Sequence, residues 1–173
     1  LKRHGISEIG VTLQYLPKCV EHHLDGIKDV RFEYFVERTP LGTAGSVGNC
    51  RSYLEDEECF LVMSGDGLTN IDITKALEAH KAKNADLTIV LKRVDDPLEY
   101  GIVITEEDGK IIRFAEKPGW DRAYSRRVNT GIYVLSPNVL KMIDNLPADF
   151  SKDIFPGMLS ENKAIYGYMT DGY

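Results

Sequence analysis

Several kinds of site are missing from this sequence. No apolar run approaches the ~20 residues that a membrane-spanning helix requires, and no signal-peptide pattern opens the chain. The three cysteines occur without a CxxC pair of the kind that holds zinc or a redox couple. No glycine loop is followed by the Lys-Ser or Lys-Thr pair of a P-loop. These absences predict a cytoplasmic protein that does not contact a membrane.

Positive charge is also scarce. The 21 Lys and Arg residues face 27 Asp and Glu residues, which gives a net charge of −6. A nucleic-acid binder needs a basic face, so that class is disfavoured, whereas a small anionic substrate responds to local charge. The 173 residues, 43% of them hydrophobic, can form one domain with its own core. Residues 1–5 are typical of a helix end capped by Gly5, so we expect a truncated piece of a longer polypeptide.

Apolar runs of strand length alternate with helical patterns in the first half of the chain. This alternation predicts βαβ units and a mainly parallel sheet, that is, an α/β protein. In the second half, two apolar runs flank Glu107-Asp108-Gly109 and predict an antiparallel hairpin. The expected strands are 8–16, 30–36, 59–63, 87–94, 101–105, 110–115, 128–135 and 164–169. The expected helices begin at Pro17, near Val47, after Asp72, after Ser136 and near Ile154.

The most apolar strand, 59–63, leads into the first candidate site, Ser64-Gly65-Asp66-Gly67. Ligands of open parallel sheets collect beyond the carboxyl ends of the strands. Glycines on both sides let the backbone approach a ligand, and a lone carboxylate there suits Mg²⁺, which prefers oxygen ligands. The alternative is a plain turn, in which Asp66 only closes the loop or caps the next helix.

A second candidate is the glycine loop, Leu41-Gly42-Thr43-Ala44-Gly45, which follows a strand and opens a helix. Free backbone N–H groups at the start of a helix can hold an anion or the edge of a base. Glycines in such a loop let a ligand approach the backbone closely. The alternative is an ordinary connection between a strand and a helix.

Two further segments carry polar side chains at strand ends. Glu116 and Lys117 could bind sugar hydroxyls and a phosphate respectively, or they could form a surface ion pair. Asn129 enters a strand in Val128-Asn129-Thr130-Gly131, where it could bind a ligand or satisfy a turn. His80 lies on the apolar stripe of a helix and is expected to be a partly buried, hydrogen-bonded side chain rather than a catalyst.

In order and approximate spacing, these four segments resemble the motifs of the sugar nucleotidyltransferases, and the likeness extends through nearly the whole chain. Within that family the chain looks most like the mannose-1-phosphate guanylyltransferases, or the guanylyltransferase-like domain that some bacterial proteins fuse to a sugar-phosphate mutase. The resemblance implies a Rossmann-like, three-layer α/β/α domain. Residues 1–95 would form its nucleotide-binding half and residues 96–173 its sugar-phosphate-binding half.

The resemblance also implies a reaction and a role for each matching position. A sugar phosphate would attack the α-phosphorus of a nucleoside triphosphate in line, with GTP and mannose 1-phosphate as the favoured pair. Asp66 would bind Mg²⁺ and would be catalytic together with Lys117. The nucleotide-binding residues would be Leu41, Gly42, Thr43, Ala44, Gly45, Gly65 and Asp66. The sugar-phosphate-binding residues would be Tyr100, Gly101, Glu116, Lys117, Asn129 and Thr130.

Two parts of the family pattern have no match in these residues. The glycine-rich loop that cradles the triphosphate is missing, and with it the first strand, which is normally central in the sheet. The second metal-binding acid of the family would lie beyond Asp171. We therefore expect the 173 residues alone to have little or no transferase activity. Open strand edges and exposed apolar surface favour association, so a homo-oligomer is expected.

Other functions stay compatible with the sequence. A catalytically silent regulatory or assembly subunit would keep the fold, although the presence of Asp66, Glu116, Lys117 and Asn129 together speaks against it. Glucose-1-phosphate thymidylyl-, uridylyl- and adenylyltransferases share the same frame, so the base and the sugar stay open. A glycosyltransferase that uses a finished nucleotide sugar is a third alternative, but its usual Asp-x-Asp metal motif is absent at residues 66–68.

Overall fold

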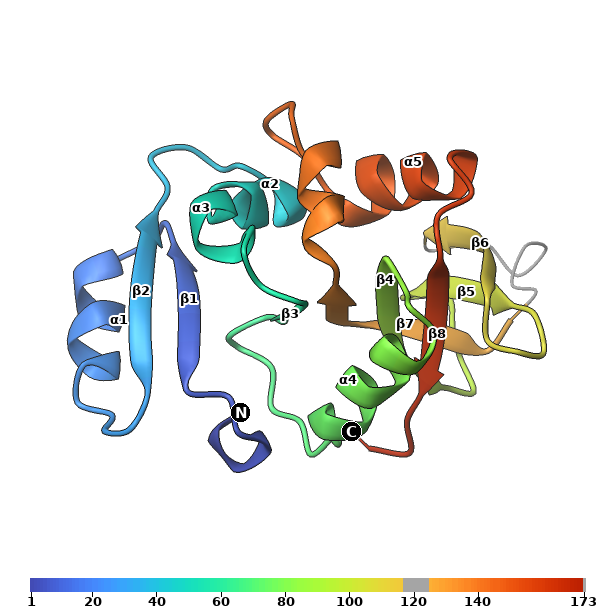
Figure 1. Ribbon diagram of the computed structural model, residues 1–173, viewed down its shortest axis with the longest axis horizontal. Coiled ribbons are helices and arrows are strands. Elements are labelled where there is room, and N and C mark those ends of the chain that lie inside the picture. Colours follow the sequence, from blue (N-terminus) through green and yellow to red (C-terminus); the bar gives the residue numbers. More distant parts are fainter. Residues whose placement is uncertain (117–124, 173) are drawn as a thin grey trace.

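The computed structural model describes residues 1–116 and 125–172 (Figure 1). The strands are β1 (Glu8–Leu13), β2 (Arg31–Val36), β3 (Phe60–Val62), β4 (Leu87–Arg93), β5 (Gly101–Thr105), β6 (Ile111–Glu116), β7 (Arg127–Leu135) and β8 (Ile165–Met169). The helices are η1 (Lys2–His4), α1 (Pro17–Leu24), α2 (Thr43–Gly48), α3 (Arg51–Leu54), α4 (Ile73–Ala82), η3 (Pro137–Met142), η4 (Phe150–Ile154) and α5 (Phe155–Ser160). No helix in this part of the chain is long and apolar enough to cross a bilayer.

Strand β7 is the central strand of the larger, six-stranded sheet. One of its edges pairs with β4, and the other pairs with β5 at Val128 and with β3 from Tyr133 to Leu135. Because β3, β4 and β5 all run antiparallel to β7, they share one direction with β8, which is parallel to β4. Four of the six strands therefore point the same way. The expected mixed sheet and the antiparallel β5–β6 hairpin are both confirmed.

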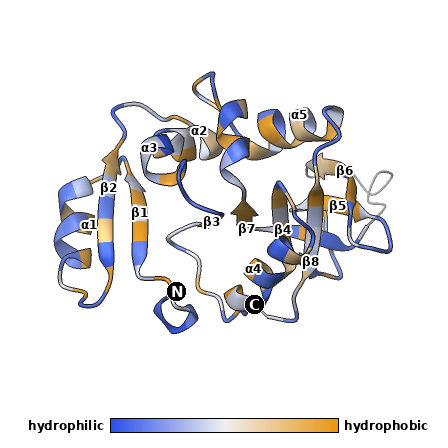
Figure 2. Cartoon of the chain, viewed as in Figure 1, coloured by the Kyte–Doolittle hydropathy of each residue, from blue (hydrophilic) through white to orange (hydrophobic). Residues whose placement is uncertain are grey.

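The sheet separates two apolar cores. Alternate residues of β7 face opposite sides, so Tyr133 and Leu135 join one core while Ile132 and Val134 join the other. The first core lies under α2, η3, η4 and α5, and the second lies under α4. Figure 2 shows the hydrophobic colour on β7, between these helices. Helices thus cover both faces of the sheet, as a three-layer α/β/α arrangement requires.

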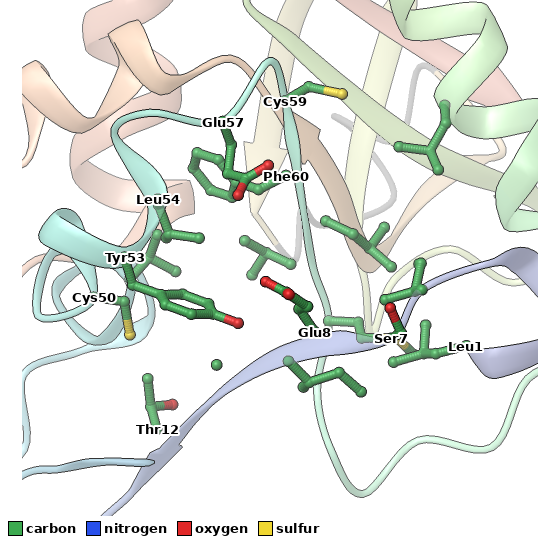
Figure 3. A pocket seen from close by; sticks show the side chains of 18 of the residues that line it. Leu1, Ser7, Glu8, Thr12, Cys50, Tyr53, Leu54, Glu57, Cys59 and Phe60 are labelled. Carbon is green, nitrogen blue, oxygen red and sulfur yellow. The ribbon is translucent and has the colours of Figure 1, made fainter. Parts of the chain in front are cut away.

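A cavity separates β1 from β3. Strands β1 and β2 form a parallel pair of their own, and no backbone ladder joins β1 to β3 among the residues described. The cavity between them has a volume of about 450 Å³ and is lined by both strands, by α3 and by residues near the amino end (Figure 3). One edge of β1 and one edge of β3 are therefore left unpaired at the place where the larger and smaller sheets approach each other.

Several elements differ in extent from the sequence-based prediction. The strand expected over 8–16 ends at Leu13, and the helix expected near Val47 is split into α2 and α3 around Gly48 and Asn49, both weak helix formers. The last helical stretch begins at Phe150 rather than near Ile154. The helix end expected at residues 1–5 is a 3₁₀ turn, and Gly5 adopts the expected left-handed cap conformation.

Candidate functional site

The glycine loop, residues 41–45, is fastened to the segment that precedes η4. The N–H groups of Ala44 and Gly45 both donate to the Ala148 carbonyl at 3.0 Å, and the Ala148 N–H donates to Leu41 at 2.8 Å. A Cβ on Gly42 would lie 2.4 Å from the same Ala148 oxygen. Gly42 and Gly45 thus allow a close approach of protein backbone, so their presence does not by itself indicate a ligand.

The side chain of Thr43 is also occupied within the protein. Its hydroxyl donates to Asp149 Oδ2 at 2.9 Å and accepts from the Phe150 N–H at 3.0 Å. The single hydroxyl proton of Thr43 is therefore unavailable to a ligand in this conformation. The backbone N–H groups of Gly42 and Thr43 make no hydrogen bond to any described residue, and both residues are exposed. These two amides are the donors that the loop can offer to a bound molecule.

Asp66 lies in the exposed connection between β3 and α4. Its carboxylate has no partner within the described residues, and a Cβ added at Gly65 would meet nothing within 4 Å. Asp72 itself caps α4 by accepting from the Lys75 N–H at 3.2 Å, so Asp66 is not the helix cap. No group of three or more His, Cys, Asp and Glu side chains forms a metal cage in the described chain. A hard cation at Asp66 would need oxygen ligands from water and substrate as well.

Gly101 and Asn129 come together around a small hollow between β5 and β7. We call it the β5–β7 hollow, and Ala115, Ser151 and Phe155 also line it. Its volume is about 20 Å³, which accommodates about one water molecule rather than a sugar ring. Tyr100, which directly precedes β5, is 47% exposed. Gly101 and Asn129, which are 28 positions apart in the sequence, both line the hollow.

The amide of Asn129 has a fixed orientation. Its Oδ1 accepts from the Gly131 N–H at 2.9 Å, and its Nδ2 donates to the Tyr133 hydroxyl at 3.0 Å. The Gly131 N–H can only donate, so the oxygen of the amide must face it. One hydrogen of Nδ2 is left for a ligand. The neighbouring Thr130 hydroxyl donates to the Val90 carbonyl at 2.8 Å, so its proton already serves the sheet.

Glu116 and Lys117 lie at the edge of what the structure describes. Glu116 ends β6, and its backbone is the register partner of Gly101, so this position is next to the β5–β7 hollow. Lys117 lies outside the described residues. The role of Lys117 stays a prediction from the sequence, and for Glu116 only the position of the backbone is added.

The 450 Å³ cavity between β1 and β3 contains none of the predicted site residues. In Figure 3, Tyr53 and Glu8 point into the same space, and Cys50 and Cys59 lie at its border. Burial raises the pKa of the Cys50 thiol to about 12 and also raises the pKa of Cys59. Both thiols therefore stay protonated near neutral pH, which makes them poor nucleophiles and metal ligands. The cavity is better explained by two unpaired strand edges than by a binding site.

Sequence reasoning missed three residues that shape the candidate site. Asp149 caps η4 and holds Thr43, while Ser151 and Phe155 form a wall of the β5–β7 hollow. A signal was present, because Asp149 precedes Ser151 and Lys152 in the pattern of an N-terminal helix cap. The contact of Asp149 with Thr43 spans 106 positions and had no sequence signal.

Comparison with known proteins places this geometry in context. A family model described as nucleotidyl transferase matches residues 1–173. Mannose-1-phosphate guanylyltransferase catalytic subunit beta of Dictyostelium discoideum is 30% identical over 98% of this chain and 47% of that protein. UTP–glucose-1-phosphate uridylyltransferase of Synechocystis is 32% identical over 99% of this chain and 48% of that protein. This chain thus spans about half the length of both curated relatives.

A solved structure shares the fold. A putative glucose-1-phosphate thymidylyltransferase from Bacillus anthracis, in complex with a sucrose, aligns with a TM-score of 0.86 and 24% identity. The alignment covers 100% of this chain and 72% of that one. This likeness confirms the expected Rossmann-like α/β architecture.

Proposed function

Because the chain belongs to the nucleotidyl transferase family, we propose that the complete protein joins a sugar 1-phosphate to a nucleoside triphosphate and releases pyrophosphate. The observation that carries the proposal is that residues 148–155 contact both candidate sites. Ala148 and Asp149 bond to the glycine loop, and Ser151 and Phe155 line the β5–β7 hollow. One segment therefore connects a candidate nucleotide site with a candidate sugar-phosphate site, as a two-substrate transferase needs.

On the nucleotide side, the free amides of Gly42 and Thr43 would donate to the base. Leu41, Ala44 and Gly45 would shape the loop around it. Asp66, with the open space at Gly65, would hold Mg²⁺ beside the triphosphate. The ion would supply charge neutralisation for the phosphates during displacement. A single carboxylate fits such a site, because Mg²⁺ usually keeps several waters and binds substrate phosphates as well.

On the sugar-phosphate side, Asn129 would donate its remaining Nδ2 hydrogen to a sugar hydroxyl. Tyr100 and Gly101 would offer backbone groups, and Thr130 would support the strand. Glu116 would accept from sugar hydroxyls, and Lys117 would meet the phosphate and neutralise its charge as it attacks. The reaction needs no side-chain nucleophile, because positioning and charge neutralisation account for catalysis of this displacement.

For the finer identity, we propose GTP and mannose 1-phosphate, which form GDP-mannose. The similarity to the guanylyltransferase of Dictyostelium supports this pair. The similarity to the uridylyltransferase of Synechocystis supports UTP and glucose 1-phosphate as the alternative pair. A silent regulatory subunit of the same fold is the alternative from another class. A melting-temperature rise of the complete protein with GTP, mannose 1-phosphate and Mg²⁺ would favour the enzyme, because only a binding-competent site gains stability from its ligands.

The test of the function uses the complete polypeptide and pyrophosphate release with each nucleoside triphosphate and sugar 1-phosphate in turn. Asp66→Asn is expected to lower kcat by about 100-fold, the usual loss when one charge-stabilising group is removed. Asp56→Asn, in the exposed loop before β3, is the matched control and should retain wild-type turnover. Wild-type turnover in the Asp66 variant, or no turnover by the parent with any pair, would contradict the proposal.

A further inference from the structure

The β5–β7 hollow is closed to a sugar in this conformation. Its volume of about 20 Å³ leaves room for about one water, so a sugar phosphate can enter only if part of the wall moves. Gly101, Asn129 and Ala115 belong to the hydrogen-bonded strands β5, β7 and β6. Ser151 and Phe155 belong instead to η4 and α5, which are packed against the sheet by side chains. Ser151, in the first turn of η4, is the part of the wall that can shift without breaking the sheet or the buried packing of Phe155.

The position of that wall is set by Asp149. Its Oδ1 accepts from the N–H groups of Ser151 at 2.9 Å and Lys152 at 3.1 Å, which fixes the first turn of η4. Its Oδ2 accepts from the Thr43 hydroxyl at 2.9 Å, and Thr43 Oγ1 accepts from the Phe150 N–H at 3.0 Å. A chain of hydrogen bonds thus runs from Thr43 of the glycine loop through Asp149 to Ser151, which lines the hollow.

We propose that Thr43 and Asp149 form a clamp through which a nucleotide on the glycine loop sets the shape of the sugar-phosphate pocket. Thr43 is then a positioning residue whose hydroxyl acts on Asp149 rather than on the nucleotide. This inference rests on the proposed function, because it assigns the loop to the nucleotide and the hollow to the sugar phosphate. It goes further by coupling the two sites.

The coupling has a physical basis in the Thr43 hydroxyl, which makes two hydrogen bonds to the start of η4. Gly42 and Thr43 are exposed, and their N–H groups bond to no described residue, so a base that accepts from them would act on the start of α2. Because Thr43 both donates to Asp149 and accepts from Phe150, any shift there is passed to the first turn of η4. Two binding events that bias the same structural element have a reciprocal coupling free energy, so each ligand should change the affinity of the protein for the other by the same factor.

The test measures the affinity of the complete protein for mannose 1-phosphate by calorimetry, with and without guanosine 5′-(α,β-methylene)triphosphate, which cannot release pyrophosphate. The affinity of the wild type for the sugar phosphate should change at least about fivefold when the nucleotide is present, the lower end of usual coupling. Thr43→Val keeps the shape of the side chain but removes both hydrogen bonds, so this ratio should fall close to one. Thr43→Ser keeps the hydroxyl and should retain the ratio.

A second measurement does not depend on turnover. Hydrogen exchange should show a change in the protection of the Phe150 and Ser151 amides when the nucleotide binds the wild type, and no such change in Thr43→Val. Wild-type binding of both ligands without coupling, or full coupling in Thr43→Val, would overturn the clamp and leave the proposed function intact. If Thr43→Val weakens nucleotide binding alone and keeps the ratio, the hydroxyl touches the nucleotide directly and the clamp is wrong. If the wild type binds neither ligand, the proposed function itself fails.

Discussion

The imidazole of His80 illustrates how a single buried residue is set by its surroundings. It is 3% exposed between α4 and β4, and its Nδ1 lies 3.0 Å from the Thr88 hydroxyl, which confirms the expected hydrogen-bonded histidine. Burial lowers its pKa from the ordinary value of 6.5; Asp86 and Glu58 act in the opposite direction, whereas Lys81 lowers it further. The neutral ring is therefore the form that the folded protein favours.

This lowered pKa predicts a loss of stability in mild acid. The unfolded chain takes up a proton as the pH falls through about 6.5, before the folded chain does. The His80 contribution should be complete above that pH and should decrease as the pH falls toward the lower folded pKa. Urea unfolding at pH 7.5 and pH 5.5 would measure it. His80→Gln should flatten the slope, while His22→Gln, on an exposed site, should leave it unchanged.

Two glycines of the candidate site differ in what surrounds them. Gly42 has a φ of +78° and no room for a Cβ beside Ala148, so Gly42→Ala should reduce stability by about 2 kcal/mol. Gly65 has open space, so Gly65→Ala should leave stability unchanged within about 0.5 kcal/mol. Denaturant unfolding of both variants checks this pair. If Gly42→Ala lost as little unfolding free energy as Gly65→Ala, the loop around Gly42 would be able to relax away from Ala148.

At the scale of elements, aromatic packing joins the helical layer to the sheet. Phe155 of α5 contacts Phe114 of β6, Tyr133 of β7 and Phe150 of η4, with ring centroids 5.0, 5.4 and 5.6 Å away. Such pairs add directional attraction to the burial of apolar surface. The same cluster supports Tyr133, whose hydroxyl holds Asn129, so core packing and site geometry depend on the same rings.

Truncation of this cluster predicts a large effect. Phe155→Ala should cost about 3–5 kcal/mol of unfolding free energy, because it removes a fully buried ring and leaves a cavity. Tyr15→Ala, at a side chain that is 83% exposed, is the control and should change stability by less than about 0.5 kcal/mol. Thermal and urea unfolding of the two variants provide the measurement. A small loss in Phe155→Ala would mean that α5 is not anchored by this ring.

At the scale of the whole molecule, the main feature is the gap between the two sheets. The cavity of about 450 Å³ lies between the unpaired edges of β1 and β3, and apolar side chains such as Phe60 and Leu54 line it. Unpaired strand edges readily pair with other chains.

The unpaired edges of β1 and β3 predict that the 173 residues associate as their concentration rises. Sedimentation over a range of concentrations and the binding of a hydrophobic dye would report the association. A monomer at every concentration that binds little dye would contradict the prediction.

Much of the fold could be read from the sequence, because local chemistry decides it. The helix expected after Asp72 is α4, which Asp72 caps, and Gly5 adopts the predicted left-handed cap conformation. Glu107-Asp108-Gly109 lies in the turn of the predicted β5–β6 hairpin. The alternation of apolar runs and helical patterns defined the α/β class, since hydrophobic periodicity reflects which faces are buried. The family motifs, too, are stretches of consecutive residues.

Long-range contacts were decided only by the tertiary structure. Thr43 meets Asp149 across 106 positions, Gly42 faces Ala148, and Asn129 shares a hollow with Ser151. No local pattern encodes such pairs, because each depends on how separate elements pack against one sheet. The sequence by itself thus determined the elements, the class and the family likeness, whereas tertiary packing decided which polar groups are already bonded to protein and which stay available to a ligand.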